Sequence, residues 1–302
     1  MDGVLVVDKP SGLTSHDVVA RARRALRVRR VGHIGTLDPM ATGVLPLVVG
    51  RATRLATLLA VGQKVYDGLV LLGVVTDTYD MTGEVKSDAR IQTGSGPFKV
   101  PKRSAVERVA EDFVGTFTQR PPPFSAKKIG GVRAYRLARR RQPVDPAPVD
   151  VTVHALEILD VTASHIRCRV SCDPGFYMRA LAHDLGAALG CGACLESLRR
   201  ERSGSFSLDQ AVTLGVLEST QSVLSSWILP ISDLLPEVPK LILTDHGTRR
   251  ASHGNDLSRA DVLSSDREWS TGLVRLCDDQ GTLVAIAKAD TAQFLHPTIV
   301  LV

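Results

Sequence analysis

Apolar residues recur along this chain with two spacings, and each spacing predicts one kind of element. Short runs rich in Val, Ile and Leu, bounded by Gly, Pro and Asp, are typical of β-strands. Longer stretches with apolar residues three and four apart are typical of amphipathic helices. We predict strands at 4–7, 44–49, 64–75, 149–161 and 165–172. Helices are predicted at 52–60 and 178–189, and another begins near residue 104. A further helix begins near Ser15, which can cap it, and continues through the Arg-rich stretch. Because strands and helices do not alternate regularly, the pattern favours the α+β class.

The composition changes at residues 230–239, and the segment beyond them is short and strand-rich. Strands are predicted at 241–243, 273–277, 283–287 and 298–302. We therefore predict a large domain over residues 1–234 and a small β-rich module over residues 235–302.

Composition narrows the classes of protein that fit. Hydrophobic residues make up 44% of the chain, yet the longest apolar stretches, such as 69–75, fall far short of the roughly 20 residues that span a bilayer. The first residues lack the features of a secretory signal, so we expect a cytoplasmic protein that does not enter membranes.

The five cysteines have two readings. Cys168, Cys172, Cys191 and Cys194 have the residue types of a four-cysteine zinc site. However, Cys168 and Cys172 fall in a strand-like run, where small buried side chains explain them adequately. We favour the second reading and expect neither a disulfide framework nor a metal.

Net charge is +5, but its distribution is more informative than its sum. Residues 21–30 contain six arginines in ten positions, and residues 121–141 combine three consecutive prolines with a basic helical stretch, which predicts a protruding positive arm. Separate clusters of this kind favour a polyanionic partner, because Arg binds phosphate oxygens bidentately. The candidate phosphate-binding residues are Arg21, Arg24, Lys127, Lys128, Arg139, Arg140 and Arg141.

The loop from Val31 to Pro46 concentrates polar residues capable of chemistry among glycines and prolines. Asp38 precedes Pro39, and His33 lies five residues earlier. Taken alone, an Asp-Pro pair is more often a turn in which Asp accepts backbone hydrogen bonds, and His33 is an ordinary loop histidine. Neither residue defines a site by itself.

The whole string GHIGTLDPMATGVLP closely resembles the catalytic motif of the TruB family of tRNA pseudouridine-55 synthases. Four further segments resemble that family in its order: VLVVDKPSGLTSHDVV, KVYDGLVLLGVVTDTYDMTGEV, PPPFSAKKIGGVRAYRLAR and GFYMRALAHDLGAALGCGACLESLRRERSGSF. The resemblance spans nearly all of residues 3–212. It implies a pseudouridine synthase fold with a central mixed, largely antiparallel sheet, and a PUA-like RNA-binding module at the C-terminal end.

The resemblance also implies an activity and residue roles. The expected reaction is isomerisation of uridine 55 in the TΨC loop of tRNA, without a cofactor and with the chain as a monomer. Asp38 would be the nucleophile at C1′ or C6, or a base at C2′, and Arg179 would pair with it. Tyr66 would stack on the base and assist proton removal from C5. His33 would replace the flipped nucleotide, and the remaining pocket residues would be Asp80, Tyr177 and Leu198.

Three positions depart from the usual family pattern: Phe176, Cys194 and Glu201. Of these, Glu201 stands beside the expected RNA surface, where a negative charge would weaken affinity. Two alternative functions remain open from sequence: an RNA-binding or tRNA-folding module with incidental modification, and a guide-RNA-dependent enzyme acting on ribosomal RNA.

Overall fold

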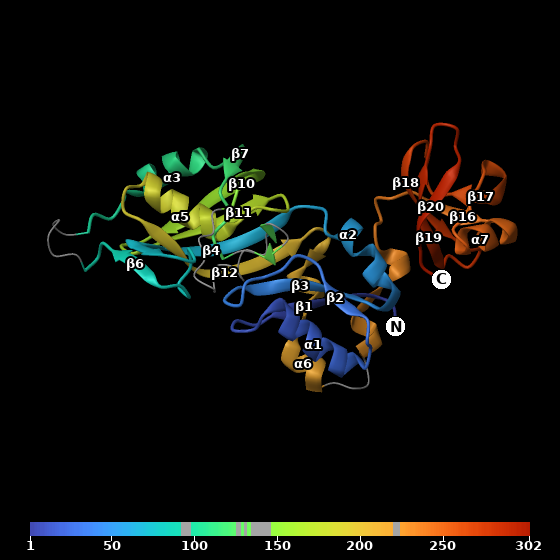
Figure 1. Ribbon diagram of the computed structural model, residues 1–302, viewed down its shortest axis with the longest axis horizontal. Helices are drawn as coiled ribbons and strands as arrows, with labels where there is room; N and C mark the ends of the chain where they lie inside the picture. Colours follow the sequence, from blue (N-terminus) through green and yellow to red (C-terminus); the bar gives the residue numbers. More distant parts are fainter. Residues whose placement is uncertain (92–97, 125–127, 130–131, 134–145, 220–223) are drawn as a thin grey trace.

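A large mixed sheet forms the centre of the protein (Figure 1). The computed structural model describes all residues except 92–97, 125–127, 130–131, 134–145 and 220–223. The 11 strands of this sheet are β1 (Gly3–Lys9), β2 (Val31–His33), β3 (Thr42–Val49), β4 (Lys64–Leu72), β7 (Gly115–Gln119), β10 (Val149–Val161), β11 (His165–Cys172), β12 (Ala193–Ser203), β13 (Phe206–Ser207), β14 (Val212–Thr213) and β15 (Ile228–Pro230).

The strand order is β14-β1-β3-β12-β4-β11-β10-β7, with β2, β13 and β15 paired to β3, β12 and β1 beside this path. Of the strand pairs described in this sheet, only β1–β14 and β3–β12 are parallel. The sheet is therefore mixed and largely antiparallel, as predicted. Strand β12, which lies in the middle of it, was not predicted.

Helices cover one face of the sheet. They are α1 (Ser15–Leu26), α3 (Arg103–Glu111), α5 (Met178–Ala188) and α6 (Leu214–Ser219). Apolar residues of α1, α5 and α6 share one core with β1, β3 and β4, for example Val18, Leu181 and Leu217 with Leu45 and Val70. The helix predicted at 52–60 is instead a 3-10 segment, Gly50–Leu55, followed by the single turn α2 (Ala56–Leu59).

The long strand predicted at 64–75 is interrupted. Gly73 has φ 83°, which an L-amino acid adopts only with strain, and it separates β4 from β5 (Val74–Thr76). Strand β5 pairs with β6 (Val85–Asp88), and a second small pair is formed by β8 (Lys128–Ile129) and β9 (Val132–Arg133). Asp80 lies in the turn that connects β5 to β6.

The C-terminal part is a separate sheet of 5 strands in the order β17-β16-β18-β19-β20. Its elements are β16 (Lys240–Leu243), α7 (Asp245–Ser252), β17 (Val262–Ser265), β18 (Gly272–Cys277), β19 (Leu283–Ala289) and β20 (Leu295–Val300). The α+β class and the β-rich C-terminal module are thus confirmed, whereas the boundary at residue 234 stays a prediction. Among the described residues, no helix is long and apolar enough to cross a bilayer.

Candidate active site

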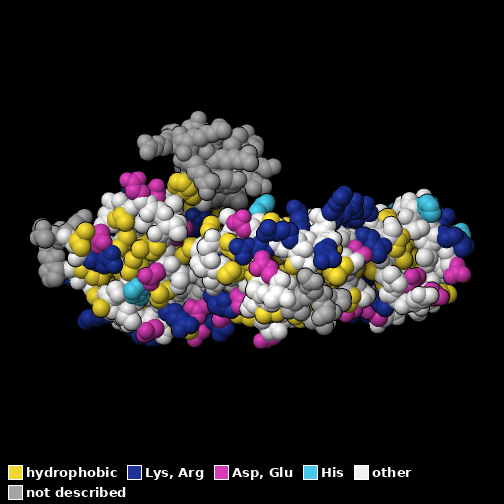
Figure 2. All heavy atoms as spheres, turned by 90° about the horizontal axis from the view of Figure 1, so that it is seen from below, with side chains coloured by type: hydrophobic (Ala, Val, Ile, Leu, Met, Phe, Trp, Pro, Cys, Tyr) yellow, Lys and Arg dark blue, Asp and Glu magenta, His cyan; other side chains and the backbone are white. Residues whose placement is uncertain are grey.

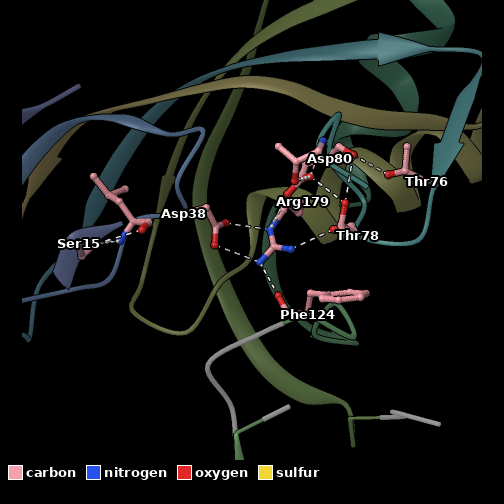
Figure 3. A network of polar contacts seen from close by, with 9 residues as sticks. Ser15, Asp38, Thr76, Thr78, Asp80, Phe124 and Arg179 are labelled. Carbon is pink, nitrogen blue, oxygen red and sulfur yellow. Dashed lines mark hydrogen bonds and ion pairs between the residues drawn. The ribbon is translucent and has the colours of Figure 1, made fainter. Parts of the chain in front are cut away.

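Asp38 and Arg179 form a two-pronged ion pair (Figure 3). Nε of Arg179 lies 2.8 Å from one carboxylate oxygen of Asp38, and Nη2 donates to the other at 3.2 Å. The Arg179 side chain is only 6% exposed, whereas that of Asp38 is 36% exposed. The carboxylate is therefore held from the protein side and open on the other, and this geometry brings the predicted pair together.

Arg179 has further partners that fix its plane. Its guanidinium donates to the carbonyl oxygens of Thr78 at 3.0 Å and Phe124 at 2.8 Å, and Nε lies 3.6 Å from Asp80. Because Arg179 is the second residue of α5, its charge faces the positive end of the helix dipole. Two carboxylates offset that unfavourable position, which explains why the cation is stable there.

Asp80 is buried behind Arg179 and is held by its own turn. One of its carboxylate oxygens accepts hydrogen bonds from the hydroxyl of Thr78 at 2.8 Å and from both the hydroxyl and the backbone N–H of Thr82, at 2.6 and 2.9 Å. Its backbone carbonyl accepts from Thr76 at 2.7 Å. Asp80 is thus a support for Arg179, consistent with the orienting role that the family resemblance implied.

The loop that presents Asp38 is attached to the core by its neighbours in sequence. The hydroxyl of Ser15 donates to the carbonyl of Leu37 at 3.1 Å and accepts from its N–H at 2.9 Å. The prediction that Ser15 caps α1 is wrong, because Thr14 is the cap and Ser15 is free to bind the loop. On the other side of Asp38, the buried ammonium of Lys9 donates to the carbonyl of Pro39 at 3.1 Å.

The far end of this loop meets β12. Gly43 has φ 98°, and a Cβ there would lie 2.2 Å from the carbonyl oxygen of Arg200. Only glycine therefore lets the loop pair with β12 at this point. Lys9 and Arg200 were not predicted as site residues. The sequence offered one indication of them: both are basic residues inside the segments that resemble the TruB family.

A pocket of about 190 Å³ opens beside Asp38. Of the predicted residues, five line it: Asp38, Tyr66, Tyr177, Arg179 and Leu198. Tyr66 is 8% exposed, and burial raises the pKa of its phenol. The backbone of Tyr177 is fixed by buried Gln119, which donates to its carbonyl and accepts from its N–H. Lys64 and Phe176 also line the pocket.

His33 lies apart from this pocket. It ends β2, is half-buried, and packs edge-on against His16 with ring centroids 5.3 Å apart. The structure thus places it on the chain segment leading to Asp38 without making it a wall of the cavity.

The basic residues are only partly described. Arg24 is exposed on α1, and Arg21 lies 3.7 Å from Glu218. Figure 2 shows Lys and Arg side chains gathered between the middle of the molecule and its C-terminal module. Lys127, Arg139, Arg140, Arg141 and the side chain of Lys128 lie outside the described residues.

Glu201 faces away from the pocket. It accepts two hydrogen bonds from Arg169 in β11. Arg169 lies opposite Asp67 in β4. Because Asp67 follows Tyr66 in the strand, its side chain lies on the other face of the sheet from Tyr66, which lines the pocket. Its charge is therefore balanced within the sheet.

The five cysteines are mostly buried. All five are free thiols, and burial raises the pKa of Cys168 and of Cys172 to about 12. Within the described ranges, no group of three or more His, Cys, Asp or Glu side chains is placed to hold a metal ion.

Comparison with known proteins agrees with this geometry. Residues 23–178 match the model of the TruB family pseudouridylate synthase N-terminal domain, and residues 179–236 match the tRNA pseudouridylate synthase B C-terminal domain. Proteins named tRNA pseudouridine synthase B are similar over almost the whole chain. That of Solibacter usitatus is 43% identical over 100% of both chains, and that of Geobacter sulfurreducens is 40% identical over 96% of this chain and 94% of its own.

Solved structures give the same result for the fold. A chain in the structure of an H/ACA RNP bound to a substrate RNA containing 2′-deoxyuridine has a TM-score of 0.74 and 25% identity, covering 99% of this chain and 85% of its own. A chain of a Cbf5-Nop10-Gar1 complex has a TM-score of 0.73 and 26% identity, with the same coverage.

Fold and sequence together define the class as that of the pseudouridylate synthases, which are isomerases. Within that class, the chain belongs to the TruB family. The resemblance seen in the sequence motifs is thereby confirmed.

Proposed function

We propose that this protein isomerises uridine 55 in the TΨC loop of tRNA to pseudouridine. The full-length similarity to proteins named tRNA pseudouridine synthase B supports tRNA as the substrate. The single observation that carries the chemistry is the Asp38–Arg179 pair at the edge of a small pocket. A carboxylate fixed on one side and open on the other is the reagent that the reaction needs.

The isomerisation breaks the bond between N1 and C1′ and forms one between C5 and C1′. C5 loses a proton and N1 gains one, so there is no net redox change, and no cofactor is required. Asp38 attacks C1′ or C6, or removes a proton at C2′; each route uses the ionised carboxylate. The guanidinium of Arg179 contacts both oxygens of that carboxylate and so fixes its direction.

A uridine stacked inside a tRNA loop cannot reach Asp38 in this pocket, so we expect it to leave its stack before reaction. Tyr66 would stack on the base and take the proton from C5, with Tyr177 and Leu198 among the other walls of the pocket. His33 would occupy the place of the flipped nucleotide in the loop.

Phosphates of the tRNA would be held by the basic surface that includes Arg21 and Arg24. The arm predicted from the sequence at residues 121–141, with Lys127, Lys128, Arg139, Arg140 and Arg141, would extend the same role. Contacts of this type make binding salt-sensitive.

The variant Asp38→Asn tests the proposal. It keeps the size of the side chain but removes the nucleophile, so release of tritium from [5-³H]uridine-labelled tRNA should stop while tRNA binding persists. Asp67→Asn is the matched control, because Asp67 pairs with Arg167 on the opposite face of the same sheet and should retain activity. Undiminished product from Asp38→Asn would contradict the proposal.

The substrate position is tested with tRNA in which uridine 55 is replaced by cytidine. No pseudouridine should form elsewhere in that tRNA. Failure to modify an isolated TΨC stem-loop would favour the guide-dependent alternative, and an unmodified but refolded tRNA would favour the RNA-folding alternative.

A further inference from the structure

Arg200 is a charged residue at the centre of the sheet that is completely buried, with 0% exposure. Its Nε donates to the carbonyl of Val44 at 2.7 Å, and its Nη2 donates to the carbonyl of Gly35 at 2.8 Å. These two carbonyls lie on either side of Asp38 in sequence. One planar guanidinium therefore fixes both ends of the loop that carries the proposed nucleophile.

The positive charge of Arg200 has no counterion within the described part of the chain. Its remaining nitrogen, Nη1, is buried and has no hydrogen-bond partner among the described residues, and none of their carboxylates lies within ion-pair distance of the guanidinium. Burying a cation without a carboxylate partner is costly. The buried charge therefore stabilises the negative form of a neighbouring side chain that can lose a proton.

The neighbour in position to do so is Tyr66. Arg200 in β12 and Tyr66 in β4 are direct register partners in an antiparallel pair. Directly opposite side chains lie on the same face, with Cβ atoms about 5 Å apart. Tyr66 in turn lines the pocket beside Asp38.

Other charged or titratable groups also surround Tyr66. Burial raises the pKa of its phenol, the charge of Arg200 lowers it, and Cys172 in β11 and Asp38 in the loop raise it. Lys64, two residues earlier on the same face of β4, has its own pKa lowered by burial and by Arg200. Arg200 is therefore the principal favourable charge for an ionised Tyr66.

We propose that Arg200 is a positioning residue for Tyr66: it holds both ends of the Asp38 loop and supplies the buried positive charge that stabilises the Tyr66 phenolate. The inference rests on the proposed role of Tyr66 at C5. The phenol first loses its proton to solvent. The phenolate then takes the proton from C5, the C–H electron pair returns to the uracil ring, and N1 acquires a proton from solvent.

The ionisation of Tyr66 can be measured without turnover. The chain contains four tyrosines, so ¹³C labelling at the tyrosine Cζ gives a simple NMR spectrum, and Tyr66→Phe identifies the Tyr66 signal. In Arg200→Gln, the Tyr66 signal should titrate at least about one pH unit higher than in the wild type, because a close cation shifts a pKa by that order. The kcat should fall, with KM nearly unchanged.

Arg169→Gln is the matched control, since Arg169 pairs with Glu201 on the other face of the sheet; its Tyr66 titration should equal that of the wild type. An unchanged titration in folded Arg200→Gln would overturn the proposal. If that variant does not fold, Arg200→Lys carries the test. It keeps the charge, so its Tyr66 titration should stay within about half a pH unit of wild type while kcat falls; a larger shift would overturn the proposal.

These outcomes are separable from those of the proposed function. If Tyr66→Phe retains full turnover, the role of Tyr66 at C5 fails, whatever its titration shows. If turnover is lost in Tyr66→Phe but Arg200→Gln leaves the Tyr66 signal unmoved, only the role of Arg200 fails.

Discussion

Arg179 holds both carboxylate oxygens of Asp38 from within the protein, at 2.8 and 3.2 Å. The bidentate geometry fixes the direction of the carboxylate as well as its charge. Arg179 is itself fixed by the carbonyls of Thr78 and Phe124. The orientation of the Asp38 carboxylate is therefore set by three separate segments of the chain.

Arg179→Lys should lower kcat by about 100-fold with a smaller effect on KM, because a point charge cannot hold both oxygens and small misplacements of a reacting group cost rates of that order. Steady-state kinetics on tRNA measure both constants. A kcat within a factor of three of wild type would show that bidentate orientation is unimportant.

Ser15→Ala should lower the free energy of unfolding by about 1–3 kcal/mol, because it leaves the buried N–H and carbonyl of Leu37 without partners. The control is Ser11→Ala, whose exposed hydroxyl bonds the carbonyl of Met40 and whose loss should cost less than about 0.5 kcal/mol. Urea unfolding monitors both variants. Equal losses would mean that Ser15 does not anchor the loop.

Lys9 should make stability depend on alkaline pH. Burial lowers the pKa of Lys9 from 10.5 to about 8, against the opposing charge of Asp38. Between these values the unfolded chain binds more protons than the folded one, so the contribution of Lys9 to stability rises with pH in that window.

Lys9→Met removes this titration and isolates it from other groups. The difference in unfolding free energy, wild type minus Lys9→Met, should increase from pH 8 to pH 10. Urea unfolding at matched pH values measures it, and parallel pH curves for the two proteins would contradict the assignment.

Cys191 should be the thiol that reacts first in the native protein. It is half-buried, whereas Cys168, Cys172, Cys194 and Cys277 are buried. Alkylation with iodoacetamide at pH 8, followed by peptide mass spectrometry, should label Cys191 before the others, and Cys191→Ser should remove the fast phase. Faster labelling of any buried cysteine would argue against the core as described.

Arg24→Gln should weaken tRNA binding and reduce its salt dependence. Loss of one phosphate contact lowers the slope of log K against log salt by about 0.7–0.9. The control is Arg108→Gln, an exposed arginine on α3, which lies near the opposite end of the sheet from α1 in Figure 1. Equal effects of the two variants would show that α1 is no specific contact surface.

The sequence predicted most of the elements whose apolar residues recur at a regular spacing. It did not predict an element that lacks this spacing and is held by contacts with distant parts of the chain. β12 carries Arg199, Arg200, Glu201 and Arg202 in succession, which does not look like a central strand. It is one because Arg199 pairs with Asp8, Glu201 pairs with Arg169, and Arg200 bonds buried carbonyls. None of these partners is close in sequence.

The candidate site shows the same limit. Asp38, Tyr66 and Arg179 could be named from motifs, because each stands at a recognisable position within one. The residues that support them could not be named in this way. Gln119, Lys9 and Arg200 bind backbone carbonyls and N–H groups, and such contacts leave no pattern in the sequence. Only the folded chain shows which carbonyls need a donor.

The apolar cluster beneath β1 and β3 extends into the C-terminal module: Val4, Val6 and Leu55 share it with Leu283 and Ile286. Separating the two parts would expose these side chains to water, at a cost of roughly 25 cal/mol for each Å² uncovered. The shared cluster therefore keeps the two parts at a fixed spacing, and we expect any RNA that contacts both of them to match that spacing.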